Sequence, residues 1–390
     1  MMALAAGAPL LIDGQLPQAV AQDLWARVRE LFVIPHDRIY LNVGTLGAQP
    51  RPVLHAVIDA SRRTAESTPP GVNWEALEQS TARLLDCDPA GLAFPRNTTE
   101  AMNFVAHGLE YRPGDHIVTT NHEHIGGLCC WQLAAARQQL RLTQVDITAM
   151  PSDAQQVFER IRAALTPRTR VVSVSHVNFT TGFVMPVQDI IELCRQRGII
   201  SVIDGAHPPG LMKLSMRELN PDFYASSPHK WLLAPQGTGL LWMNEEWRTR
   251  LWPTIASGDW DNRQLGARRF NHLGTLDESR FAGLQAAYEF FELVGPERIY
   301  ARIDVLRQHL LDRLSAIAGI QLATPRTHSA GMVSFKLRGV SSLELQKRLA
   351  ERNVRTRVIG EYDYGWMRLS PHVYNSLEEL DRVVELISRA

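Results

Sequence analysis

Several features that would mark a class of protein are missing from this sequence. Its 41 basic and 41 acidic side chains leave no net charge, so nothing global predicts a nucleic acid or an anionic membrane as partner. No apolar run is long enough to span a bilayer. The apolar start, MMALAAGAPLLIDG, is short and has no basic segment, so we expect neither a signal peptide nor a membrane anchor.

Cysteine is also scarce and poorly spaced for a disulfide or zinc framework. No CxxC pair occurs, and we expect free thiols in a reducing cytoplasm; the cysteines are Cys87, Cys129, Cys130 and Cys194. The one metal-like pattern is His122–Glu123–His124, for which no third ligand stands at helical or strand spacing. We therefore expect no metal site, and a structural turn role for His122.

What the sequence does contain is enough apolar residues for a large core. The 390 residues are 45% hydrophobic, which allows two domains. Short apolar runs alternate with segments of helical periodicity, a pattern that predicts an α/β fold with a mostly parallel sheet and helices on both faces. The expected strands are 92–94, 141–145, 170–175 and 199–203, and the expected helices include 74–85, 154–165 and 187–197.

Two of the predicted strands end in residues with distinctive chemistry. The run 199–203 leads into Asp204, and the run 223–225 leads into Ser226, Ser227, Pro228, His229 and Lys230. Pyridoxal phosphate (PLP) needs a lysine amine for a Schiff base and an acid beside its ring nitrogen. Lys230 and Asp204 could supply these groups, although a surface lysine and a strand-end aspartate would give the same spacing.

The sequence motifs around these residues resemble those of the class V aminotransferase family of fold-type I PLP enzymes, and of the isopenicillin N epimerase-like branch in particular. The motifs are DGAH at 204–207, SPHKW at 227–231 and APQGTG at 234–239, and the resemblance runs from about Tyr40 to the C-terminus. It implies PLP as cofactor, a small-molecule amino acid as substrate, and a homodimer with shared active sites.

The start of a predicted helix after strand 92–94 is a candidate phosphate site. Thr98 and Thr99 follow Asn97, and a helix N-terminus offers free N–H groups to an anion. An ordinary helix cap would look the same, but the resemblance also points to phosphate binding. It further implies phosphate contacts from Ser227 and His229.

The resemblance also assigns roles around the cofactor ring and the substrate. His124 would stack on the ring, His207 would bond the ring hydroxyl, and Asn178 would reach the ring hydroxyl or the substrate carboxylate. Arg368, in WMRLS, would grip the substrate α-carboxylate, with a structural strand arginine as the alternative. Arg355 and Arg357 are expected to be solvated, although either could face the cleft.

The domain limits follow from the same reading. We expect an N-terminal arm and helix over 1–35 packing on the small domain, a large PLP-binding domain over 36–266, and a smaller C-terminal α+β domain over 267–390. By resemblance, Gly274 and Thr275 in the crossing segment would reach the partner subunit's phosphate.

The reaction itself stays open at this stage. No cysteine follows Cys194, which argues against the persulfide chemistry of cysteine desulfurases, and Gln236 and Pro208 depart from the family's usual residues. With Lys230 as base and Asp204 supporting the ring, transamination, epimerisation with His124 as second acid, and carbon–sulfur β-elimination all remain. A non-catalytic protein that keeps the fold is the less favoured alternative.

Overall fold

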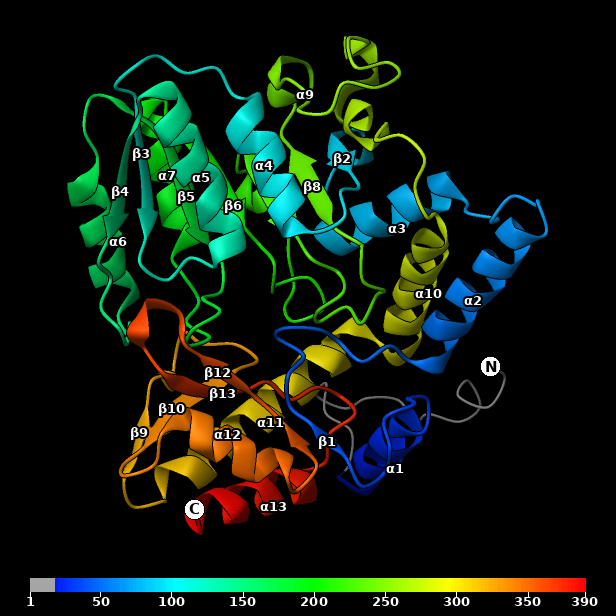
Figure 1. Cartoon of the computed structure of the whole chain (residues 1–390), viewed down its shortest axis with the longest axis vertical. Helices are drawn as coiled ribbons and strands as arrows, with labels where there is room; N and C mark the ends of the chain where they lie inside the picture. Colours follow the sequence, from blue (N-terminus) through cyan, green and yellow to red (C-terminus); the bar gives the residue numbers. More distant parts are fainter. Residues whose placement is uncertain (1–17) are drawn as a thin grey trace.

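The computed structural model describes residues 18–390, with side chains from residue 24 onward (Figure 1). The first described element is helix α1, Gln18–Arg29, which falls within the arm and helix expected over 1–35. The remainder of the expected N-terminal arm, residues 1–17, lies outside the described residues.

The larger body is built on a sheet in the order β2-β8-β7-β6-β5-β3-β4. Its strands are β2 (Leu92–Ala93), β3 (His116–Thr120), β4 (Arg141–Val145), β5 (Thr169–Ser175), β6 (Ile200–Asp204), β7 (Phe223–Ser226) and β8 (Leu240–Met243). Neighbouring strands from β4 to β7 pair in parallel, while β8 runs antiparallel to both β7 and β2. The predicted mostly parallel α/β sheet is confirmed.

Helices cover both faces of this sheet because successive strand residues point to opposite sides. Val202 packs in the core on one side, and its neighbour Ile203 packs in the core on the other. The first side carries α4 (Thr98–Gly108) and α5 (Ile125–Gln138), and the second carries α6 (Ala154–Ala164) and α7 (Val187–Arg197) (Figure 1).

A second, smaller sheet forms the other body of the molecule. It is antiparallel, in the order β12-β13-β10-β9. The elements are α11 (Pro296–Ser315), β9 (Ile320–Leu322), β10 (Val333–Leu337), α12 (Ser342–Ala350), β11 (Val354–Arg355), β12 (Arg357–Ile359), β13 (Trp366–Leu369) and α13 (Leu377–Ser388). The N-terminal strand β1 (Ile39–Tyr40) joins this body by pairing in parallel with β11.

The expected large-domain limit, residue 266, falls before a helix that packs on the large body. Helix α10 (Ser279–Val294) lies against α2 (Arg51–Ala65) and α3 (Trp74–Leu85) (Figure 1). The chain then turns at Gly295, with φ +97°, and α11 begins at Pro296 and runs into the small body. The domain limits themselves stay a prediction.

Short elements connect these bodies and shape the rim of the large one. They are α8 (Met216–Leu219), α9 (Trp247–Arg250) and the 3-10 segments η1 (Pro89–Gly91), η2 (Arg263–Asn271) and η3 (Glu361–Asp363). Segment η3 bridges β12 and β13, and its Tyr362 hydroxyl donates to the Glu123 carbonyl at 2.6 Å. The small body is thereby bonded to the turn after β3.

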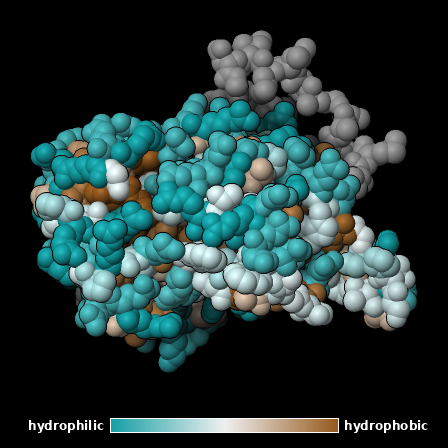
Figure 2. Space-filling model, turned by 90° about the horizontal axis from the view of Figure 1, so that it is seen from above, coloured by the Kyte–Doolittle hydropathy of each residue, from teal (hydrophilic) through white to brown (hydrophobic). Residues whose placement is uncertain are grey.

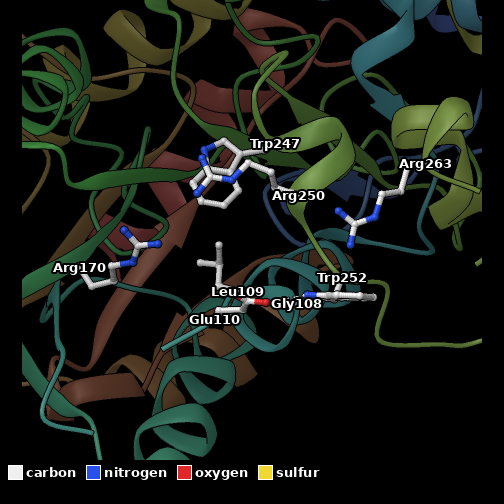
Figure 3. A pocket seen from close by; sticks show the side chains of 8 residues that line it. All are labelled: Gly108, Leu109, Glu110, Arg170, Trp247, Arg250, Trp252 and Arg263. Atoms are coloured by element: carbon white, nitrogen blue, oxygen red, sulfur yellow. Dashed lines mark hydrogen bonds between the residues drawn. The ribbon is translucent and has the colours of Figure 1, made fainter. Parts of the chain in front are cut away.

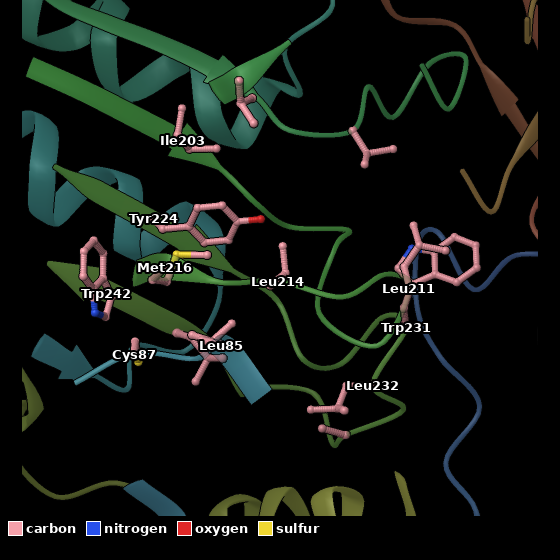
Figure 4. Close-up of a cluster of buried hydrophobic side chains, with 14 of the residues drawn as sticks. Leu85, Cys87, Ile203, Leu211, Leu214, Met216, Tyr224, Trp231, Leu232 and Trp242 are labelled. Carbon is pink, nitrogen blue, oxygen red and sulfur yellow. The ribbon is translucent and has the colours of Figure 1, made fainter. Parts of the chain in front are cut away.

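The apolar core continues beneath the loop that carries Lys230. Figure 4 shows Tyr224 of β7, Trp231 and Leu211 among buried neighbours of this cluster. Trp231 is fully buried, so the loop after β7 is anchored immediately beside the lysine. Core packing thus holds the backbone at Lys230 in place.

The outer surface carries both hydrophilic and hydrophobic residues. The face in Figure 2 is mainly hydrophilic, with hydrophobic residues gathered in a few places. Across residues 18–390, the structure contains no helix that is both long and apolar enough to cross a membrane.

Candidate active site

A cavity of about 240 Å³ lies where the carboxyl ends of the parallel strands meet the small body. Ser175 and Asp204 end β5 and β6, and Arg357 and Arg368 enter from β12 and β13. This is the edge at which open parallel sheets bind ligands. All predicted site residues except Asn178 and Thr275 line it, namely Thr98, Thr99, His124, Asp204, His207, Ser227, His229, Lys230 and Arg368.

Lys230 stands in this cavity on a turn that directly follows β7. Its backbone N–H donates to the Ser227 carbonyl at 3.1 Å, and its Nζ lies 3.5 Å from His207 Nε2. Burial lowers the pKa of Lys230 to about 8, against the opposing attraction of Asp204. A larger fraction of this amine is therefore unprotonated at neutral pH than for a lysine in water.

Asp204 occupies the end of the central strand β6 and is only 6% exposed. Its Oδ1 accepts from the Ala206 N–H at 3.0 Å. A methyl group placed on Gly127 of α5 would lie 2.6 Å from Oδ2, so the glycine lets the helix start close to the carboxylate. Burial raises the pKa of Asp204, and Lys230 counteracts this.

His207 is held in one orientation by Trp231. The indole Nε1–H donates to His207 Nδ1 at 2.9 Å, which makes Nδ1 an acceptor. Burial first, and then the charge of Lys230, hold the pKa of His207 well below its usual range, so the ring is neutral. In that neutral tautomer, the proton sits on Nε2, which faces Lys230.

The predicted phosphate residues gather at the N-terminus of α4. Asn97 caps the helix by accepting from the Glu100 N–H at 2.9 Å. The Thr98 hydroxyl and the Ser227 hydroxyl lie 2.7 Å apart, and the Thr98 N–H donates to the same serine at 3.1 Å. His229 Nδ1 donates to the Thr238 carbonyl at 3.2 Å. Hydroxyls and helix N–H groups therefore converge as they would around an anion.

Arg368 reaches the cavity from the middle of the small sheet and is 1% exposed. Its guanidinium donates to the Phe179 carbonyl at 2.8 Å and the Thr45 hydroxyl at 3.0 Å, while its Nε has no partner. Burial, followed by repulsion from Arg357, lowers its pKa to about 9, so it stays charged at neutral pH.

Arg355 and Arg357, both expected to be solvated, differ in the structure. Arg355 is exposed, but Arg357 lines the cavity. The reason is the pairing of β12 with β13, which sets Arg357 opposite Arg368. For Arg357 the structure has the alternative left open, that it faces the cleft, because strand register is a tertiary property that the local sequence does not display.

The segment after β3 places His122 and His124 in different surroundings. His124 caps α5, accepting from the Gly126 N–H at 3.1 Å, and its ring meets Phe179 edge-on at 5.1 Å between centroids. His122 is buried outside the cavity, bonded to Thr180 and the Thr148 carbonyl. Among the described side chains, no group of three or more metal-ligating residues is assembled.

Asn178 and Thr275 do not line the cavity. Asn178 is fully buried between two residues that do, Val177 and Phe179, and neither polar atom of its side chain has a protein partner. Thr275 and Gly274 are exposed on the segment before α10.

Some cavity residues carry no role that was predicted from the sequence. They are Thr45, Gly127, Ser175, Val177, Phe179 and Ala206. Glycine Gly44 sits in a loop whose turn-forming residues are visible in the sequence, whereas Ser175 and Phe179 carry no pattern that separates them from core residues.

A second cavity, of about 230 Å³, lies on the large body away from these residues (Figure 3). Its side chains include Arg170, Trp247, Arg250, Trp252 and Arg263. The Arg250 guanidinium stacks 4.6 Å from the Trp247 ring and also pairs with Glu246. Two of its arginines, Arg250 and Arg263, are exposed on the rim.

Comparisons with known proteins agree with the geometry. The aminotransferase class-V model matches residues 66–383. The chain is 32% identical over 388 residues to isopenicillin N epimerase of Streptomyces clavuligerus, covering 93% of this chain and 97% of that protein. It is 30% identical over 331 residues to a probable cysteine desulfurase of Xylella fastidiosa, covering 80% and 78%.

A solved structure extends the likeness to the whole fold. It is of a mutant of C-DES with glycine covalently linked to the PLP cofactor, with a TM-score of 0.83, 25% identity, and coverage of 92% of this chain and 98% of that one. Another structure of C-DES describes that protein as a cystine C–S lyase, with a TM-score of 0.82, 26% identity, and coverage of 90% and 98%. From its sequence match, sheet topology and structural likeness, the chain belongs to the class V aminotransferase family and is an enzyme with the fold-type I architecture of PLP-dependent proteins.

Proposed function

We propose that this enzyme removes the Cα proton of an α-amino acid, with Lys230 as the base and Arg368 as the carboxylate-binding residue. The observation that carries the proposal is one cavity that joins a half-buried lysine with a depressed pKa, a buried strand-end aspartate and a buried arginine. A lysine becomes a useful base when burial lowers its pKa toward neutrality.

The residues present fit pyridoxal phosphate, the cofactor of this family. Gly126 and Gly127 let the start of α5 pack closely against Thr99 and Asp204, two of the residues that would hold the cofactor. Thr98, Thr99, Ser227 and His229 would hold its phosphate, and His124 would stack on its ring. Neither polar atom of the buried Asn178 amide has a partner, so this side chain could still form hydrogen bonds beside the cavity.

When bound, the cofactor supplies an electron sink for the electron pair left at Cα. Asp204 would hold the proton on the ring nitrogen, because an adjacent carboxylate favours the charged form. The Nε2–H of His207 would donate to the ring hydroxyl, since Trp231 occupies its other nitrogen.

Arg368 would fix the substrate so that the Cα–H bond faces Lys230. A guanidinium binds a carboxylate through two parallel hydrogen bonds, and this sets both position and orientation. The partner-free Nε of Arg368 is one of the donors available for such a pair.

The role of His124 bears on which product forms. Burial lowers the pKa of His124 to about 4, with Lys230 adding to the effect. A neutral imidazole suits stacking on the ring better than delivery of a proton to Cα, so epimerisation with His124 as the second acid is less favoured than its stacking role.

Carbon–sulfur β-elimination is the second candidate. It needs Lys230 as base but no catalytic cysteine, and no cysteine follows Cys194 in the sequence. The likeness to C-DES, a cystine C–S lyase, favours this route. Elimination and simple proton return at Cα share the same first step and differ in the product.

The test is a screen of amino acids against the PLP-loaded enzyme in D₂O. Cα deuterium exchange, read by mass spectrometry, reports the shared first step, and keto acids, inverted substrate or released sulfide identify the product. Borohydride reduction followed by peptide mapping should fix the cofactor on Lys230, and Lys230→Ala should lose that adduct. An adduct on another lysine, or no exchange with any amino acid, would overturn the proposal.

We also propose that the enzyme works as a homodimer with shared sites. Thr275 is exposed and does not line its own chain's cavity, as expected of a residue that serves the partner's phosphate. The stretch before it exposes Trp252 (39%), Ile255 (39%) and Trp260 (43%), which a subunit contact would cover.

Complementation tests the dimer directly. Lys230→Ala and Thr275→Val subunits should each be inactive alone, and mixing them should restore one intact site per heterodimer. Recovery of roughly a quarter of parent activity is expected for random subunit mixing. A fully active monomer in solution would contradict the proposal.

A further inference from the structure

We propose that Arg357 binds a second anionic group of the substrate, so that the enzyme prefers amino acids whose side chain carries a carboxylate. This inference rests on the proposed function, because it presumes that Arg368 takes the α-carboxylate. It adds the class of substrate, which the proposed function leaves undefined.

The first observation is the position of Arg357. It lies directly opposite Arg368 in the β12–β13 pair, and both side chains line the same cavity. Two guanidinium groups thus stand side by side on the wall formed by the small body, while the phosphate candidates gather at α4 on the large body. Arg357 is therefore placed for the substrate rather than for the cofactor phosphate.

The second observation is unused hydrogen-bonding capacity. The Nη2 of Arg357 donates to Glu361 Oε1 at 2.6 Å, but its Nε is buried and has no partner. A buried donor without an acceptor is unfavourable, and guanidinium groups bind carboxylates most strongly when two donors engage at once. An anionic group in the cavity would satisfy this donor.

The balance of charge in the cavity points the same way. Its lining residues carry three cationic groups, on Lys230, Arg357 and Arg368, against the single carboxylate of Asp204. The cofactor phosphate would lie at α4, on the large body, and an α-carboxylate on Arg368 would leave Arg357 as the second cation on the wall of the small body. The pair with Glu361 is partly exposed, 28% on the arginine side and 27% on the glutamate side, so a substrate anion can compete for the guanidinium from the cavity.

Ligand binding can test this without turnover. The PLP-loaded enzyme would be titrated calorimetrically with succinate against butyrate, and with glutarate against pentanoate. At least one dicarboxylate should bind about tenfold or more tightly than the monocarboxylate of equal length, as expected for an added charged hydrogen bond. Arg357→Gln should reduce that ratio to about one.

Two further variants separate this role from alternatives. Arg355 is exposed at the end of β11, the strand that precedes β12 in the chain, so Arg355→Gln should leave the ratio unchanged. If Arg357 served only to hold Glu361, then Glu361→Gln would abolish the preference as fully as Arg357→Gln does. The proposal instead predicts that Glu361→Gln retains the preference, because the arginine remains.

Kinetics then connect the binding preference to substrate choice. In the parent enzyme, kcat/KM should be higher for aspartate than for asparagine, or higher for glutamate than for glutamine. That ratio of acid to amide should fall about tenfold or more in Arg357→Gln. Absence of a dicarboxylate preference in the parent, or its survival in Arg357→Gln, overturns the inference. If only neutral amino acids undergo Cα exchange, this inference is contradicted and the proposed function still stands. If dicarboxylates bind preferentially but no amino acid undergoes exchange, only the proposed function is contradicted.

Discussion

Asp204 and Lys230 illustrate how burial and mutual attraction oppose each other at single residues. Burial raises the pKa of the carboxyl and lowers that of the amine, while each charge favours the charged form of the other. A bound cofactor changes this balance, because Asp204 gains the ring nitrogen as a partner. The two residues should therefore be sensitive even to substitutions that keep their size.

Asp204→Asn keeps the shape of the side chain but removes its charge. Losing a buried charged partner typically costs about 2–5 kcal/mol, so kcat should fall on the order of 100-fold or more. Steady-state kinetics with an active amino acid measure this, and cofactor content provides the control. Near-normal turnover would show that the ring nitrogen lies elsewhere.

Arg368 is expected to require its fork geometry as well as its charge. Arg368→Lys keeps the charge but loses the paired donors, so kcat/KM for amino acids should fall by roughly 30-fold or more, and Arg368→Ala by at least as much. Simple amines, which lack the carboxylate, should be much less affected. The idea fails if Arg368→Ala handles amino acids as the parent does.

At the scale of elements, the start of α5 illustrates how a helix can approach a catalytic group. His124 caps the helix, and the two glycines that follow the first helical residue let it pack closely against Thr99 and Asp204. Cap, helix start and glycine pair are all readable in the sequence, but their distance from Asp204 depends on the sheet order.

Gly127→Ala tests this approach. The added methyl group would lie 2.6 Å from Asp204 Oδ2, so either the helix or the carboxylate must move. Overpacking of this kind costs about 1–3 kcal/mol, and PLP should bind roughly 10-fold or more weakly. Cofactor titration by absorbance measures this, with Gly258→Ala, whose neighbour lies at 3.9 Å, as the matched control. Equal affinity in both variants would contradict the account.

Sequence patterns predicted those elements whose signals are local. Helix α3 has the predicted bounds, because a capping Asn73 precedes an apolar stripe. Strand β4 also has its predicted bounds. Strand β8 was not predicted, since the run LLWM is too short to distinguish a strand from a buried loop. The candidate site residues on strand ends were singled out because their chemistry is distinctive. For Arg357 the sequence favoured solvent over the cleft, because only the pairing with β13 turns it inward.

At the scale of the whole molecule, buried histidines should make stability depend on pH. Burial lowers the pKa of His122 and His176 to about 4 and that of His372 to about 3, against about 6.5 in an unfolded chain. Between those values, the unfolded state binds more protons than the folded state, so stability is lost as the pH falls below about 6.5. Glu123 opposes this trend, because burial raises its pKa to about 7.

The histidines outnumber the carboxyl groups of Glu123 and Asp204, whose pKa values burial raises, so the net slope should be positive. Each contributes up to about 1.4 kcal/mol per pH unit. Urea midpoints of the cofactor-free protein should therefore be lower at about pH 5.5 than at about pH 7.5. His176→Asn, which removes one such group beside Tyr224, should reduce the slope. Equal midpoints at the two pH values would contradict the prediction.

The strand β1 near the start of the chain has a consequence for the order in which the enzyme is assembled. Ile39 pairs with Val354, and Gly47 then donates to the His229 carbonyl at 2.7 Å beside Lys230. Thr45, between them, accepts a hydrogen bond from the guanidinium of Arg368. The wall that would receive a substrate carboxylate is thus closed only when two parts of the chain more than 300 residues apart have met. During translation the chain must extend beyond Arg368 before this pocket can form, so products that stop earlier would lack a complete site.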